Sequence, residues 1–154
     1  MAEHRSEEIL ELLRSKNRCL EKLGGETRAF LSAPLESLVV ESEGRPGPLS
    51  RYEEARSSLV HALELHDRTI GELVSVLSPE ERTPELLRDV REEMLRNERL
   101  IVGIFNADDV VFRRIAEAQS EVLKLLHETR RARDLLGKFR SSPAPTGEGM
   151  DRTL

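Results

Sequence analysis

An unbroken alternation of three- and four-residue spacings, running from Leu87 to Phe139, constrains the fold of this chain more than any other feature. Its positions are Leu87, Val90, Met94, Asn97, Ile101, Ile104, Asp108, Val111, Ile115, Ala118, Val122, Leu125, Thr129, Ala132, Leu136 and Phe139. Only Asn97, Asp108 and Thr129 interrupt its apolar character. Such a period predicts one long helix with an apolar seam, and a seam of this kind requires a partner helix.

Composition agrees with an all-helical chain. The 154 residues suffice for one domain with a modest core. Charged residues make up 34%, aromatic residues only 3%, and tryptophan is absent, which is unlike a sandwich or barrel filled by bulky side chains. We expect an all-α fold: an elongated antiparallel bundle of three to four helices over residues 1–140, with a long C-terminal helix. A flexible, disordered tail is expected over 141–154, where no periodicity remains.

The first helix is predicted over residues 6–31. Ser6 can cap its free amides, and the two glutamates that follow suit the positive end of the helix dipole. Gly24 and Gly25 interrupt its apolar face at a cost of about 1 kcal/mol each relative to alanine. The sequence therefore leaves open a kink or an early end at this glycine pair.

The second helix is predicted over residues 50–77, after a proline- and glycine-rich surface loop. Ser50 and Glu53 have the spacing of a capping box, in which each side chain accepts from the other residue's amide. Two further start signals follow, Ser78-Pro79 and Thr83-Pro84, each a capping hydroxyl before a proline. Thr83 is the preferred start of the long helix.

The long helix is predicted over residues 83–139, with one alternative. Asn106 or Asp108 could cap a new helix, which would split the long helix near residues 103–109 and give a compact four-helix bundle. The seam passes through this segment without a phase shift, and the segment contains no proline. These observations favour a continuous helix.

Two polar residues on the seam, Asn97 and Asp108, admit two interpretations. In the first, they lie where the bundle loosens and water reaches them. In the second, they are buried and fix the helix register at a cost in stability. The spacing alone favours the first.

Residues with reactive or metal-binding side chains are few and scattered. Cys19 is the only cysteine, which excludes an intrachain disulfide and indicates a reducing compartment. His61 and His66 fall on different helix faces, and no Glu-x-x-His motif is present. We interpret His66 as a histidine at the edge of the core and Cys19 as a small apolar filler. No phosphate loop, nucleophile elbow or dinucleotide fingerprint occurs, so we expect no enzymatic activity, no cofactor and no metal.

Net charge and hydropathy limit the kinds of partner that this chain is expected to bind. The net charge of −5 argues against a general nucleic-acid or anionic-membrane binder. The longest apolar run, 100–105, is too short to cross a bilayer, and the N-terminus lacks the order of a secretory signal. We expect a soluble, cytoplasmic protein without membrane insertion. Residues 113–140 nevertheless carry eight bases against four acids, so the far half of the long helix is basic.

The end of the seam is the predicted partner-binding site. If the two shorter helices pack along the same half of the long helix, the other half remains bare. It would then form a groove for another amphipathic helix or a contact in a homodimer. The residues expected there are Val122, Leu125, Ala132, Leu135, Leu136 and Phe139.

The chain resembles bacterial flagellar export chaperones of the FlgN and FliT type over residues 50–154. The resemblance lies in the run Asn97-Glu98-Arg99-Leu100-Ile101 followed by Asn106, and in the amphipathic segment to Phe139. It extends to Gly137-Lys138-Phe139-Arg140 and a tail with Met150-Asp151-Arg152. Phe139 stands where many of those chaperones have tyrosine.

This resemblance implies a cytoplasmic chaperone that sequesters the amphipathic terminal helix of a flagellar subunit, of the hook-filament junction or filament cap class. It would deliver that type III secretion substrate to the export gate. Leu125, Leu135, Leu136 and Phe139 would face the cargo, and neighbouring bases would steer an acidic partner. Two alternatives stay open: a self-associating coiled-coil structural protein, and a helical adaptor for nucleic acid or signalling partners.

Overall fold

A computed structural model describes residues 2–38 and 44–141 and confirms the all-α class. Its elements are α1 (Ala2–Ser32), η1 (Leu35–Ser37), α2 (Pro48–Ser75), η2 (Pro79–Glu81) and α3 (Pro84–Ser141), where η marks a 3₁₀ turn. The chain divides into two compact units, residues 1–116 and 117–154. Of the predicted tail, Ser141 is the last residue of α3, and 142–154 lie outside the described residues.

The first helix begins earlier than predicted and does not end at the glycine pair. It starts at Ala2, four residues before Ser6, and runs through Gly24 and Gly25 to Ser32. Its first turn is held by Arg5, which donates to the Val76 carbonyl oxygen at 3.1 Å and pairs with Glu81. This tertiary anchor explains the early start, because it compensates for weak local capping.

The second helix begins two residues before its predicted start at Ser50. α2 begins at Pro48, whose fixed φ suits the first helical position and whose missing amide costs nothing there. Gly47 is the N-cap, so Ser50 lies inside the helix and not at the capping position predicted for it. The Leu49 amide instead donates to the carbonyl oxygen of Leu38, which is buried to 1% exposure.

The start of α3 follows the sequence closely. The Thr83 hydroxyl accepts from the Leu86 amide at 3.2 Å, and the helix begins at Pro84, as predicted. The other signal, at Ser78, forms a capping box with Glu81 around the short η2 turn. Helical structure then continues through residues 103–109 without a break, which confirms the continuous alternative.

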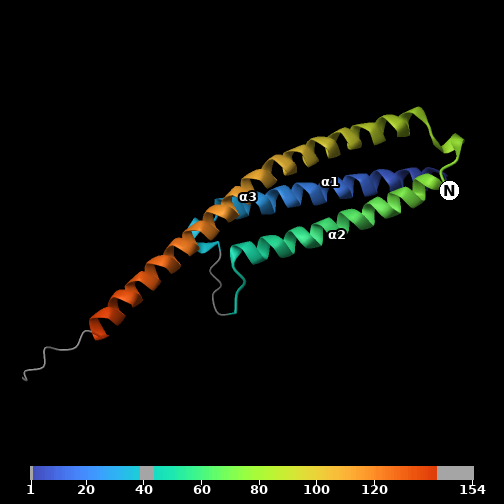
Figure 1. Cartoon of the computed structure of the whole chain (residues 1–154). Helices are drawn as coiled ribbons and strands as arrows, with labels where there is room; N and C mark the ends of the chain where they lie inside the picture. The colour runs from blue at the N-terminus through green and yellow to red at the C-terminus, as the bar shows by residue number, and fades with distance from the viewer. Residues whose placement is uncertain (1, 39–43, 142–154) are drawn as a thin grey trace, which may run out of the picture. The chain divides into compact units, whose positions relative to one another are not determined.

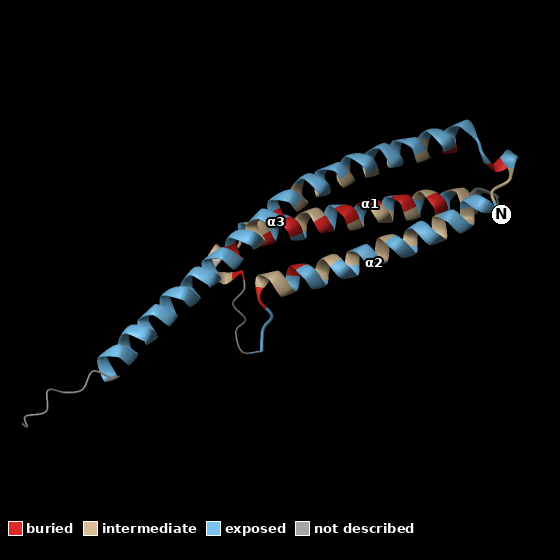
Figure 2. Ribbon diagram, in the orientation of Figure 1, coloured by how far each residue is buried: buried red, intermediate tan, exposed pale blue. Residues whose placement is uncertain are grey.

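Within the first unit, α1 lies between α2 and the first part of α3 (Figure 1). α2 runs antiparallel to α1: Arg5 contacts Val76, Lys16 pairs with Asp67 at 2.6 Å, and the Phe30 and Tyr52 rings stack. The core is drawn mainly from α1, whose ribbon carries most of the red that marks buried residues in Figure 2. Its buried apolar members are Ile9, Leu13, Leu20, Leu23 and Phe30.

Polar contacts fix the register of α3 against the other two helices. Asn17, fully buried on α1, donates to the backbone and side-chain oxygens of Glu93 at 3.0 and 2.9 Å and accepts from Asn97 at 3.1 Å. Arg56 on α2 makes a bidentate pair with Asp108, at 2.6 and 2.9 Å. Asn97 and Asp108 therefore fit the register-setting interpretation, which the spacing alone did not favour.

Candidate functional site

The six residues predicted as a partner-binding site lie on α3 in the second unit, and all of them are exposed. We call them the C-terminal stripe: Val122, Leu125, Ala132, Leu135, Leu136 and Phe139. At 3.6 residues per turn they fall on one side of the helix. Phe139 is 79% exposed and Leu136 58%, so the side chains best suited to a core have no cover. Leu123 and Leu126 are also exposed, at 58% and 51%, on a different side that the seam did not include.

Basic residues surround the C-terminal stripe. Between Arg130 and Arg140 the helix carries five bases and one acid, Asp134. All of these side chains are exposed. An apolar strip with cationic borders matches an amphipathic helix whose polar face is acidic, because each charge meets its opposite at the edge of the contact.

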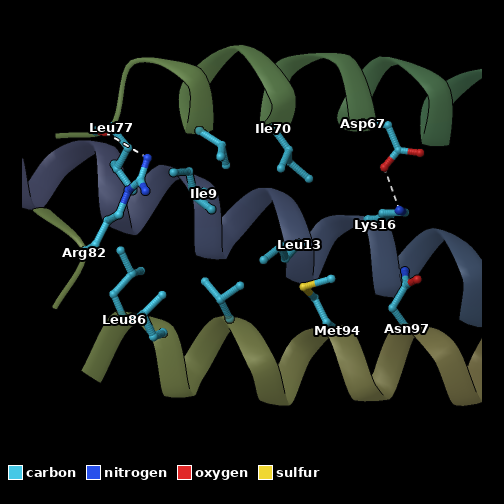
Figure 3. A pocket seen from close by; sticks show the side chains of 13 residues that line it. Ile9, Leu13, Lys16, Asp67, Ile70, Leu77, Arg82, Leu86, Met94 and Asn97 are labelled. Carbon is cyan, nitrogen blue, oxygen red and sulfur yellow. Dashed lines mark hydrogen bonds and ion pairs between the residues drawn. The ribbon is translucent and has the colours of Figure 1, made fainter. Parts of the chain in front are cut away.

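A second apolar surface lies in the first unit, in a groove between α2 and α3 (Figure 3). The α2–α3 groove has a volume of about 530 Å³. Its floor is Ile9 and Leu13 of α1. Its walls come from the facing sides of the two outer helices: Ile70, Val74 and Leu77 on one, Leu86, Leu87, Val90 and Met94 on the other. Figure 3 shows Ile70 and Met94 on opposite walls, above and below α1.

Charged and polar side chains border this groove without filling it. Lys16 pairs with Asp67 along the α2 wall, and the Arg82 guanidinium donates to the Leu77 carbonyl oxygen at 3.5 Å. Farther along the two helices, Arg56 and Asp108 bridge α2 to α3. The bidentate hydrogen bonds to Asp108 raise the pKa of Arg56 above its ordinary value. This bridge holds the two outer helices together at that end.

A further apolar row on α3 was predicted only in part from the sequence. We call it the outer stripe: Leu87, Met94, Ile101, Phe105 and Phe112. Phe105 and Phe112 are 66% and 69% exposed. The long seam included Leu87, Met94 and Ile101 but missed both phenylalanines. The signal that could have found them is the seven-residue step between two of only four phenylalanines in the chain.

A shallow concavity of about 650 Å³ follows the outer stripe. Leu87 and Met94 border both this concavity and the α2–α3 groove, so the two surfaces are continuous. Arg91 and Glu98 border the concavity, and Leu95 and Val102, about half exposed, extend its apolar part. The apolar surface of α3 is therefore wider than the part that α1 covers.

The reactive residues considered in the sequence, His66 and Cys19, lie at half-buried positions on α2 and α1. His66 lies within 3.2 Å of the Ser15 hydroxyl, between α2 and α1, as expected for a histidine at the core edge. Cys19 is a half-buried free thiol. Across residues 2–38 and 44–141, no three side chains of His, Cys, Asp or Glu gather as metal ligands. No helix in the same ranges is both long and apolar enough to cross a membrane.

Comparison with family models, curated proteins and solved structures gives no match for this chain.

Proposed function

We propose that this protein is an export chaperone that binds the amphipathic terminal helix of a flagellar, type III secretion substrate. The observation that carries the proposal is the C-terminal stripe, a row of large apolar side chains left uncovered within a basic helix. An unassembled filament-side subunit exposes a helix of the complementary kind. A helix that covers it reversibly prevents premature assembly without requiring any catalytic group.

The class of cargo is supported by the resemblance at Asn97–Ile101 and at Gly137–Arg140. The stripe itself supports only the mode of binding, in which one helix docks on another through anchors at three- and four-residue spacing. Within this mode, Leu136 and Phe139 are the main anchors because they combine size with exposure.

The test is a binding titration with terminal peptides of hook-filament junction and filament cap proteins, measured by calorimetry. Leu136→Glu together with Phe139→Glu should lower the affinity at least tenfold, since two charges would enter an apolar contact. Circular dichroism should show unchanged helicity, because both positions are exposed. The matched control is Leu65→Glu with Val76→Glu, which adds the same charges at exposed apolar positions of the first unit. Unchanged capture by the Leu136/Phe139 variant contradicts the proposal.

A second candidate function is a self-associating structural or adaptor protein. The outer stripe favours it, because this apolar row lies outside the C-terminal stripe and has no role in cargo binding as proposed. Self-association through the outer stripe is compatible with a chaperone, whereas self-association through the C-terminal stripe would compete with cargo.

A further inference from the structure

We propose that the outer stripe binds the outer stripe of a second copy of this chain, in an antiparallel pair with two-fold symmetry. The pair would be centred between Arg99 and Leu100. This interaction is independent of the proposed chaperone function, because it uses residues 87–112 of the first unit only.

Four members of the outer stripe, Leu87, Met94, Phe105 and Phe112, have a palindromic spacing of 7, 11 and 7 residues. An antiparallel pair centred between residues 99 and 100 places each residue opposite the one at the same distance on the other side of the centre. Leu87 then faces Phe112, and Met94 faces Phe105, each contact occurring twice. Such self-complementarity is what an isologous dimer contact requires, because both copies contribute the same patch.

Shape supports the same register. Leu87 and Met94 lie where the outer concavity meets the α2–α3 groove. The side chains that face them in the pair are the two phenylalanines, which are the largest exposed apolar groups of the first unit. Each ring would therefore cover the mouth of the other copy's groove. Leu95 and Val102, offset by two residues from each other across the axis, would pack along the same edge.

Charge supports it as well. Arg91 and Asp109 lie on the same flank of the stripe, and both are exposed. In the antiparallel register, Arg91 of one copy is opposite residue 108 of the other, one position from Asp109. A two-fold axis brings the same flanks together, so two Arg91–Asp109 pairs form across the contact.

The contact would extend along most of the part of α3 that lies in the first unit. The stripe spans 26 residues from Leu87 to Phe112, or about 38 Å of helix at 1.5 Å per residue. Glu98 lies opposite Ile101, so the centre is mixed and the two ends are apolar. The phenylalanines at the ends would supply most of the stabilisation, since aromatic side chains dominate contacts of this kind.

The first experiment is sedimentation equilibrium of the full chain from roughly 1 to 200 µM, a range that covers typical dissociation constants of homodimers. We expect a dimer, and Phe105→Glu with Phe112→Glu should raise its dissociation constant at least tenfold at unchanged helicity. The matched control is Leu136→Glu with Phe139→Glu, which should leave the dimer intact. A chain that stays monomeric throughout, or a dimer lost only in the control, overturns the proposal.

The second experiment tests the antiparallel register by charge exchange. Arg91→Asp and Asp109→Arg should each weaken the dimer severalfold, because like charges then face each other. The double variant should restore the dissociation constant to within about threefold of the original. If both single variants weaken the dimer and the double variant does not restore its dissociation constant, the proposed register is wrong. The register is equally wrong if neither single variant changes the dissociation constant.

Discussion

At the scale of single residues, the buried amide of Asn17 does most to join α1 to α3. Its side chain has 0% exposure and makes three hydrogen bonds, all to residues at least 76 positions away in the sequence. A buried polar group of this kind stabilises only while it is fully bonded, because each orphaned partner then lacks both protein and water.

Asn17→Ala should therefore destabilise the protein by about 2–3 kcal/mol, the cost of leaving buried hydrogen-bond partners unsatisfied. Urea unfolding followed by circular dichroism measures the change. Asn106→Ala is the matched control, because Asn106 is exposed on α3 and should change the free energy of unfolding by no more than about 0.5 kcal/mol. Equal effects of the two substitutions would show that Asn17 does not pin the helices.

At the scale of elements, the sequence predicted helices well where local chemistry decides their ends. Thr83-Pro84 and Ser78-Pro79 both mark real starts, since the hydroxyl and the proline act within one turn. The start of α1 was missed because it depends on Arg5 reaching Val76, which no local pattern shows. The start of α2 was missed because Gly47-Pro48 precedes the more conspicuous Ser50–Glu53 pattern.

The C-terminal stripe and the outer stripe could be predicted from the sequence to different degrees. The periodicity predicted the C-terminal stripe, because part of an apolar seam stays exposed when the seam is longer than the helices that pack against it. It could not identify Phe105 and Phe112 of the outer stripe, because a single seam was fitted to a helix whose apolar surface is wider than one seam. It also could not assign roles to Asn97 and Asp108, since their partners, Asn17 and Arg56, lie on other helices.

Glu81, in the η2 turn, should make the stability of the protein depend on pH in the acid range. Hydrogen bonds from the Ser78 backbone amide and hydroxyl, together with nearby Arg5, lower the pKa of Glu81. A carboxylate whose pKa is lower in the folded state than in the unfolded state stabilises the fold. This contribution is complete above the unfolded pKa, about 4.3, and is lost as the pH falls through the folded pKa. Glu81→Gln should therefore be less stable than the unmodified chain at pH 7, and the difference should shrink steadily below about pH 4.

Thermal unfolding monitored at intervals from pH 7 to pH 3 would measure that difference. The matched control is Glu80→Gln, an exposed neighbour in the same turn. If the difference in thermal stability between the Glu81→Gln variant and the unmodified chain stays constant from pH 7 to pH 3, Glu81 does not have this role.

At the scale of the whole molecule, charge is divided unevenly between the two units. The first unit, residues 1–116, carries 17 basic and 23 acidic residues, whereas residues 117–140, the helical part of the second unit, carry six basic and four acidic. An acidic partner is therefore repelled by most of the chain and attracted by one helical segment. Because exposed charges act over about 10 Å at 0.1 M salt, this division influences where a partner first makes contact more than how tightly it stays.

Replacement of Arg130, Arg131 and Arg133 by glutamate should consequently slow association with an acidic cargo helix by roughly tenfold at low ionic strength. The dissociation rate should change much less, because the apolar anchors remain. Stopped-flow association rates measured from low to high salt would test this, and the variant and the unmodified chain should converge as screening increases. The matched control reverses Lys22, Arg51 and Arg68, three exposed bases of the first unit, with little expected effect at the binding helix. If both triple variants slow association equally, net charge alone steers the partner, and the basic segment has no special part in recruiting it.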